Sequence, residues 1–463
     1  MKRLLMTMGI AALSSMAFSQ SVYDALTFSQ FNPVLGTARY AGMAGAFTAL
    51  GGNSSAIKDN PGALGIYRSS ELTFSPSLYI NNDGEVKGAL DNFAFVINFG
   101  NKKRKHGYVT SSLGINYNRS NISRYTRQKM EESSVSLSDY FGNMGPGDPH
   151  YYLSQDINLL DEEGYSLFAP DAFIQRGYTL MEKGHIGQWD IAYGLNISNI
   201  FYVGAAFGIN TIEYKQSTIY DEETLPNYEY DHWYMDKTYY ASGHGFNFRV
   251  GAIVRPIDEL RIGASFETPT YYDMSDYYDI EIGDDFASSL EPQDEAFYDI
   301  RTPLKFKAGL AGVIGKKAMI DVDYQYQNYK KIRMKADDIN IDSETDIAEE
   351  RMNQEHTIKV GAEVQVADGF FVRAGGAYST SPTKDLTAKE AASVTNLRIC
   401  TFPKQAIYVT GGAGYKGEHF YCDLAYAFQN RKDHLYPFFP YYSEPKEANL
   451  KTRNIIATIG WRF

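Results

Sequence analysis

The sequence predicts an all-β protein: a transmembrane β-barrel of fourteen antiparallel strands with an N-terminal hatch inside its lumen. Three observations lead to this prediction. Apolar and polar residues alternate over many segments, the connections between these segments alternate between short and long, and the sequence closes on a strand that ends at Phe463. Short turns on one rim and long loops on the other are typical of barrels that cross outer membranes.

Strict alternation locates the strands and their two faces. In residues 188–198 every second residue is large and apolar, and the residues between them include Asp190 and Asn196. Residues 318–328 and 419–429 repeat the pattern. Because a shift by one residue would place carboxylates in lipid, the pattern fixes which residues face inward.

The same template predicts fourteen strands, each near the ~10 residues that a tilted membrane strand requires. They are residues 71–80, 90–99, 108–118, 188–198, 201–213, 244–254, 259–267, 303–314, 318–328, 356–366, 369–379, 405–416, 419–429 and 453–463. Since the number is even, we expect both termini on the rim that carries the short turns.

The connections separate into two classes. The short ones are 100–107, 199–200, 255–258, 315–317, 367–368 and 417–418, and the others are 81–89, 119–187, 214–243, 268–302, 329–355, 380–404 and 430–452. A soluble sandwich has no reason to sort its loops by length, so this regularity favours a membrane barrel with its short side in the periplasm.

The expected lumen face carries many charges. They are Asp190, Arg249, Arg261, Lys305, Lys307, Asp321, Asp323, Lys359, Glu363, Arg373 and Asp423. Mixed charges are ordinary in a wet lumen. They could also hold the hatch or guide a polar solute.

The start of the chain and its composition fit an exported membrane protein. Lys2 and Arg3 precede a short apolar run with small residues near its end, so residues 1–19 are predicted to be a signal peptide. The chain has 37 Tyr, 27 Phe and 3 Trp, and the interfacial girdles of membrane barrels consume aromatic residues. The net charge of −12 argues against a nucleic-acid partner.

Residues 20–70 lack the strand pattern and are rich in glycine and alanine, yet they include Phe31, Tyr40, Phe47 and Leu64. Large apolar residues need a wall to bury against, and a fourteen-stranded barrel has a lumen wide enough to leak unless it is filled. We therefore expect residues 20–70 to form a hatch inside a barrel made by residues 71–463.

The stretch from Arg39 to Gly65 resembles the N-terminal hatch of the FadL family of outer-membrane transporters for long-chain fatty acids and other hydrophobic compounds. Asn60, Pro61 and Leu64 match the family's Asn-Pro-Ala-Gly-Leu-like motif, whereas residues 62–63 reverse its Ala-Gly order. The resemblance implies a fourteen-stranded barrel, passive uptake, a sideways exit into lipid and long outer loops that form a groove.

Two sets of residues are candidates for the ligand path. Asn60, Pro61 and Gly62 are expected to be a hatch pivot, since proline fixes its own backbone angle and glycine permits angles closed to other residues. The outer loops 214–243 and 268–302 match the groove-forming loops in position. Their candidate capture residues are Tyr228, Tyr230, Trp233, Tyr234, Tyr271, Tyr272, Tyr277 and Tyr278.

A calcium site is a weak further candidate, at Asp338, Asn340, Asp342 and Glu349. Their spacing approaches that of a calcium-binding loop, but Ser343 stands where such loops need glycine. A solvated acidic loop explains these residues better, and no metal or other cofactor is expected. An enzyme is not expected either, because the chain has no nucleophile elbow and no histidine pair at helical spacing.

Together these features predict a channel in the outer membrane of a Gram-negative bacterium that takes up a hydrophobic small molecule, such as a long-chain fatty acid. The expected partners are this ligand, the outer-membrane lipids, and the barrel assembly machinery, through the strand ending at Phe463. The barrel is expected to be a monomer. Two alternatives stay open: a general or polar-solute porin, and an interaction barrel that serves protein export or surface attachment.

Overall fold

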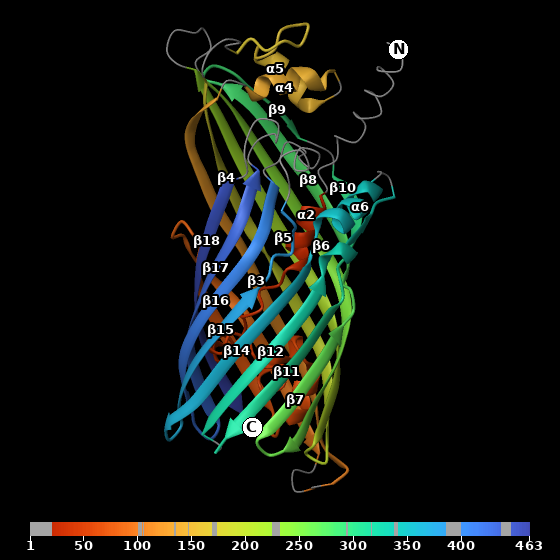
Figure 1. Cartoon of the computed structure of the whole chain (residues 1–463), viewed down its shortest axis with the longest axis vertical. Coiled ribbons are helices and arrows are strands. Elements are labelled where there is room, and N and C mark those ends of the chain that lie inside the picture. Colours follow the sequence, from red (N-terminus) through yellow and green to blue (C-terminus); the bar gives the residue numbers. More distant parts are fainter. Residues whose placement is uncertain are drawn as a thin grey trace.

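The protein is a tall barrel with a segment of chain inside it (Figure 1). The computed structural model describes residues 21–463 except 101–103, 105, 134–135, 147, 169–173, 225–231, 293–294, 316, 338–340, 386–399 and 437–445. Among the described residues, no helix is both long and apolar enough to cross a membrane.

Fourteen strands form the closed antiparallel ring, which confirms the predicted fold class. They are β1 (Glu71–Ile80), β2 (Val86–Gly100), β3 (Tyr108–Ser133), β4 (Ile174–Ile197), β5 (Phe201–Thr224), β6 (His232–Ile257), β7 (Leu260–Glu267), β11 (Lys305–Ile314), β12 (Ala318–Asn328), β14 (Gln354–Ala367), β15 (Phe370–Ser379), β16 (Cys400–Lys416), β17 (Phe420–Tyr436) and β18 (Lys446–Arg462). The ring closes where β1 pairs with β18, with Leu72 opposite Trp461. Closure removes the two edge strands that an open sheet would present to lipid.

The alternation expected from the sequence is present in the wall. On β4, Trp189, Ile191 and Tyr193 are exposed on the outer face, whereas Asp190 and Ala192 are buried. The last strand, β18, shows the same alternation, and the rings of Trp461 and Phe463 at its end are exposed. The outward apolar residues thus form the surface that a bilayer requires.

Several wall strands are far longer than the sequence pattern predicted. β3 and β6 each have 26 residues, and β4 and β5 each have 24. The expected loop 214–243 is therefore largely strand, and the expected loop 119–187 begins and ends in strand. The wall thus rises beyond the height a bilayer needs. The prediction was wrong there because the outward residues of these extensions are polar, so they lack the apolar stripe by which a membrane strand is recognised.

Short strands extend the wall along the same side. They are β8 (Tyr271–Asp284), β9 (Ser288–Pro292), β10 (Ala296–Arg301) and β13 (Arg333–Lys335). β8 continues the line of β7 along β6, and β10 joins β8 to β13. Three helices accompany these extensions: α4 (Leu137–Met144), α5 (Pro149–Asp156) and α6 (Asp342–Arg351). A short 3₁₀ turn, η3 (Tyr329–Lys331), follows β12.

The chain that precedes β1 lies within the barrel (Figure 1, red to orange). It forms α2 (Val22–Ser29), α3 (Ala38–Gly42) and the 3₁₀ helices η1 (Ser54–Lys58) and η2 (Pro61–Ile66). α2 lies toward the rim with the long connections, whereas the C-terminus lies at the opposite rim (Figure 1). The expectation that both termini share the short-turn rim is therefore wrong for the N-terminal end, because residues 21–70 run through the lumen before the first strand begins. We call residues 21–70 the hatch.

A row of glycines receives the hatch backbone. Gly194, Gly204 and Gly251 lie side by side on β4, β5 and β6. A Cβ at any of them would overlap the hatch: Leu64 at Gly194, the Pro61 carbonyl at Gly204 and the Asn60 side chain at Gly251. Glycine within a strand often marks a place where another backbone approaches closely. This glycine row lets η2 lie directly on the wall.

Replacing Gly251 with valine should therefore unseat the hatch and leave the barrel closed. Overpacking of this kind costs about 1–3 kcal/mol, so amide exchange in residues 21–70 should accelerate about tenfold to a hundredfold. Gly411→Val is the matched control, because the nearest atom to a Cβ at Gly411 is 3.8 Å away. Equal hatch exchange in both variants would show that close approach at Gly251 does not seat the hatch.

Candidate functional site

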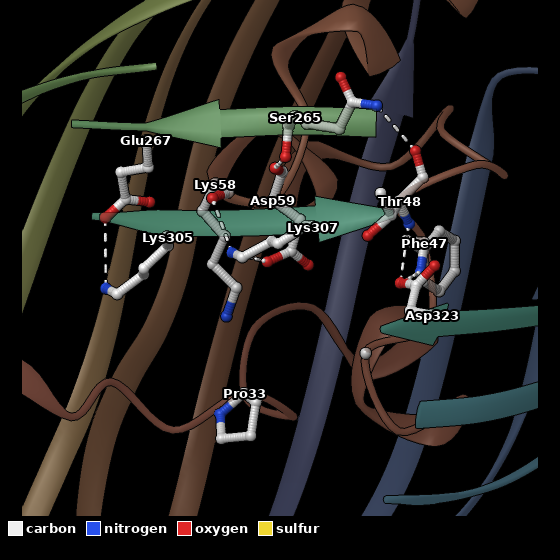
Figure 2. A network of polar contacts seen from close by, with 12 residues as sticks. Pro33, Phe47, Thr48, Lys58, Asp59, Ser265, Glu267, Lys305, Lys307 and Asp323 are labelled. Carbon is white, nitrogen blue, oxygen red and sulfur yellow. Dashed lines mark hydrogen bonds and ion pairs between the residues drawn. The ribbon is translucent and has the colours of Figure 1, made fainter. Parts of the chain in front are cut away.

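Inward carboxylates of β12 hold the middle of the hatch. Asp323 Oδ2 accepts hydrogen bonds of 2.9 Å from the backbone N–H groups of both Phe47 and Thr48. Asp321 Oδ2 accepts one of 3.0 Å from Leu50 N–H. Figure 2 shows Asp323 reaching the backbone at Phe47 and Thr48. This hatch segment has few internal hydrogen bonds, so the wall provides the acceptors that buried N–H groups require.

A second cluster surrounds Asp59 of the hatch (Figure 2). Its carboxylate lies 2.6 Å from Lys307 Nζ and 3.6 Å from Lys359 Nζ, and it also accepts from the hydroxyl of Tyr40. Ser265 Oγ donates to the Asp59 carbonyl at 2.5 Å. All these side chains are buried. A buried carboxylate is tolerable only when it is paired in this way.

Arginines complete the attachment of the hatch to the wall. Arg39 of α3 pairs with Glu363 at 2.8 Å, and Arg373 links Glu363 to Asp423 at 2.5 and 2.6 Å. Arg249 pairs with carboxylates on β4 and β7. The prediction that these charges face inward is confirmed, and most of them are occupied by the hatch or by one another.

Asn60 and Pro61 lie at the contact between the hatch and the glycine row. Asn60 Nδ2 donates to the carbonyls of Thr48 at 2.8 Å and Ala252 at 3.0 Å, and its Oδ1 caps η2 by accepting from Gly62 N–H at 2.9 Å. The side chain thus ties one hatch turn to another and to β6. A pivoting motion of this segment stays a prediction.

A chamber of about 150 Å³ lies between α2 and the part of the hatch that contains Lys58 and Asp59. Lys58 and Asp59 contribute to its floor, and Phe31 and Pro33 belong to the link that leads to α2. Its wall is mostly polar, with glutamines, tyrosines and ion pairs from many strands. Such a lining suits a hydrogen-bonding or charged group better than a plain hydrocarbon.

Lys58 is the most informative charge in this chamber. Its ammonium donates to the Leu35 carbonyl and lies 4.9 Å from the Phe31 ring centroid and 4.6 Å from that of Tyr40. The described residues place no carboxylate within ion-pair distance of it, whereas the neighbouring Lys305 and Lys307 are both paired. An ammonium has three donors, so a buried Lys58 can receive an anionic oxygen.

Above the chamber, α2 fills an apolar part of the lumen. Leu26 and Phe28 are buried, and the Phe28 ring meets that of Tyr214 edge-on at 5.4 Å. At the start of α2, Glu344 of α6 accepts from Val22 N–H at 2.8 Å. Burial raises the pKa of Glu344 to about 7. A carboxylate at a helix N-terminus complements the helix dipole, so α6 holds α2 in the lumen.

The wall beside the chamber has a seam between β2 and β3. The ladder that joins these strands ends at Asn92 opposite Asn118, although β2 continues on β1 to Val86 and β3 continues on β4 to Ser133. At the same level β2 carries a bulge at Asp91. Bulges bend a strand and end local pairing.

Side chains of the β1–β2 turn close the seam at its upper end. Asn82 Oδ1 accepts from Tyr125 N–H at 3.1 Å. Between this contact and Asn118, consecutive β3 residues 120–124 all line the chamber. A strand paired on both sides would present only alternate residues. The chamber therefore reaches the edge of β3 that is not paired with β2, where the Tyr79 hydroxyl donates to the Ser123 carbonyl at 3.2 Å.

The predicted capture residues are placed differently from the expectation. Trp233 and Tyr234 lie on β6, and Tyr271, Tyr272, Tyr277 and Tyr278 lie on β8, so all six are in strands rather than loops. Trp233 and Tyr272 are buried inside, whereas Tyr271 and Tyr277 are exposed. Tyr228 and Tyr230 lie outside the described residues.

The structure gives the calcium candidate no support in its described part. Asp342 and Glu349 lie on α6, which begins where a loop was expected, and Glu349 pairs with Arg333. No group of three or more His, Cys, Asp or Glu residues able to hold a metal is found in the described part of the chain. Asp338 and Asn340 lie outside it.

Neither sequence comparison finds a relative, since no protein-family model and no curated protein match the chain. Solved structures do match. The toluene transporter TodX of P. putida is 10% identical with a TM-score of 0.56, covering 93% of this chain and 99% of that one. A FadL homologue of Pseudomonas aeruginosa is 13% identical with a TM-score of 0.56, covering 94% of this chain and 99% of that one. The toluene transporter TbuX of Ralstonia pickettii is 14% identical with a TM-score of 0.53, covering 95% of this chain and 100% of that one. The expected resemblance is confirmed as a shared fold.

Proposed function

We propose that this protein is an outer-membrane channel for passive uptake of a hydrophobic small molecule with an acidic headgroup, such as a long-chain fatty acid. The fold it shares with transporters of toluene and with a FadL homologue supports a hydrophobic cargo. In this proposal the hatch blocks the straight path, the chamber receives the headgroup, and the cargo leaves sideways into the membrane.

The seam between β2 and β3 is the observation that carries the proposal. A polar solute would need a path through the hatch, which is bonded to the wall around the lumen. An apolar chain can instead pass from the chamber along the edge of β3 where residues 120–124 line the chamber and pairing with β2 has ended. The bilayer is the favourable destination for such a chain.

The cargo class follows from Lys58. A toluene-like compound could offer the Lys58 ammonium only a ring face, which Phe31 and Tyr40 already provide, whereas a carboxylate would form a charge-assisted hydrogen bond with it. Phe31 and Tyr40, whose rings flank the ammonium, would exclude water from this pair. Asn60 directly follows Asp59, which lines the chamber. We therefore propose that Asn60, Pro61 and Gly62 pivot when the headgroup arrives.

In this proposal α2 occupies the entry route from the long-connection rim. A cargo of similar width would have to displace it from the apolar lining, of which Tyr272 and Tyr214 are part. The inward aromatic residues are thus the ones that we propose receive the apolar chain, whereas Tyr271 and Tyr277 are exposed on the outer surface.

A porin for polar solutes is the second candidate, because most residues that line the chamber are polar. It differs in its route, since a polar solute would cross the hatch rather than the seam. Large ion conductance by the intact protein would favour it.

Deleting Asp91 should test the sideways route. The deletion removes the bulge opposite Ser75 and Pro76, so the upper part of β2 can continue its pairing with β3. We expect uptake of a fluorescent long-chain fatty acid by cells to fall to the level of cells without the protein. Asp91→Asn is the control, since it keeps the bulge and should retain uptake.

Undiminished uptake by the deletion variant, at equal surface abundance and with a folded barrel, would rule out the seam as the exit. Complete misfolding is checked by the heat-resistant mobility that closed barrels show. If neither the deletion variant nor the parent takes up the fatty acid, and the parent conducts ions strongly, the porin candidate replaces the proposal.

Lys58→Met should remove the preference for an acidic headgroup. The parent is expected to bind a long-chain fatty acid more tightly than the matching alcohol. The variant should lose about tenfold to a hundredfold in affinity for the acid alone, since a hydrogen bond to a charged group contributes about 1.5–3 kcal/mol. Lys335→Met, at an exposed lysine, is the control. Equal losses for acid and alcohol would mean that Lys58 supports the hatch rather than the cargo.

A further inference from the structure

The long-connection end of the molecule carries a compact structure that does not line the chamber. It is made of α4, α5, residues 157–168 and the hairpin of β8 and β9, and it stands at the top of the wall (Figure 1). We call it the crown. The strands that carry it are more than twice the length that a membrane strand needs, so the crown lies well outside the bilayer.

The crown is a rigid platform rather than a loose loop. Glu222 of β5 is buried and accepts hydrogen bonds from Ser136 Oγ at 2.5 Å, Leu137 N–H at 2.9 Å and Trp233 Nε1 at 3.0 Å. Phe141 of α4 packs edge-on against Trp233 with ring centroids 5.8 Å apart. These contacts fasten α4 to β5 and β6.

The β8–β9 hairpin joins the same platform and presents a phenylalanine to solvent. Ser289 Oγ donates to Asp156 Oδ2 of α5 at 2.8 Å. In the turn, Asp284 Oδ1 accepts from Phe286 N–H at 2.8 Å and Ala287 N–H at 2.6 Å. These bonds fix the turn, and the Phe286 side chain is 93% exposed. A rigidly presented aromatic ring loses little entropy when a partner covers it.

Other exposed apolar residues accompany Phe286 on the crown. Leu290 is on β9, Tyr152 is on α5, and Tyr165 and Leu167 are in the segment after α5. These side chains supply apolar area that a partner could remove from water.

The charge of the crown is of one sign. The sequence has no Lys or Arg between Lys129 and Arg176, nor between Arg261 and Arg301, and both stretches are rich in Asp and Glu. Asp156, Glu163 and Asp285 are among the exposed acids. A surface of one sign raises the rate of encounter with a partner of the opposite sign and repels a second copy of itself.

We propose that the crown is a docking surface for a cationic polypeptide whose apolar side chains cover Phe286 and other exposed apolar residues of the crown. The exposed acids supply the charge complementarity, and the Phe286 ring supplies the aromatic anchor that a stable interface needs. No group of acidic residues able to hold a metal occurs among the described residues, so a partner bridged by divalent cations fits less well. The surface is separate from the chamber and the seam.

Binding of a model peptide to the full-length protein in zwitterionic lipid nanodiscs tests this proposal. The probe is a fluorescent 20-residue amphipathic peptide of lysine and leucine, compared with its glutamate counterpart, with empty nanodiscs subtracted. The cationic peptide should bind, and Phe286→Ala should weaken it about 30-fold, as expected for a central aromatic anchor. Asp285→Asn should weaken it a few-fold and reduce its salt dependence.

Phe99→Ala is the matched control, because Phe99 is an exposed phenylalanine of β2 at the short-turn end, and it should leave binding unchanged. Parent-like binding by Phe286→Ala would overturn the proposal, as would equal binding of the acidic peptide. So would an absence of peptide binding together with calcium-dependent binding of lipopolysaccharide vesicles, since the crown would then bind a glycolipid.

Discussion

The whole arrangement depends on satisfying the polar backbone of the hatch inside a barrel. The hatch has only short helical turns, so many of its N–H and C=O groups have no partner within it, and an unpaired buried group is costly. Asp321 and Asp323 accept three of these N–H groups, and Asn60 and Lys359 donate to hatch and wall carbonyls. Direct contact of backbone with wall is possible only because glycines stand at the contact.

This constraint also determines what the lumen can do. Most inward charges are neutralised by the hatch or by one another, so they do not form an open ion path. What the hatch leaves is a small chamber with one buried ammonium that lacks a carboxylate partner among the described residues, and a seam at its side. Hydrogen bonds and ion pairs between the hatch and the wall block the straight route. Along the sideways route, β2 and β3 are not paired beyond Asn92 and Asn118. The geometry therefore favours a cargo that can enter lipid.

Much of the wall could be predicted from sequence because a membrane barrel imposes a period of two on it. The alternation around Asp321 and Asp423 identified both their strands and their inward direction. The strand extensions were missed because their outward residues are mostly polar and give no apolar stripe, and the tyrosines of β6 and β8 were therefore assigned to loops. The close approach of the hatch at Gly204 and Gly251 could have been predicted, since both glycines occupy inward-facing positions of their strands. The seam could not, because it depends on where two strands stop pairing.

The central claim is that the hatch closes the straight path through the barrel. Single-channel conductance in planar bilayers of the protein with and without residues 21–70 tests it most directly. The account predicts a nearly silent parent and a variant that stays a folded barrel with large, steady conductance, since a fourteen-stranded lumen without a plug is open to water. Equal conductance of the two proteins, with the barrel intact in both, would contradict the account.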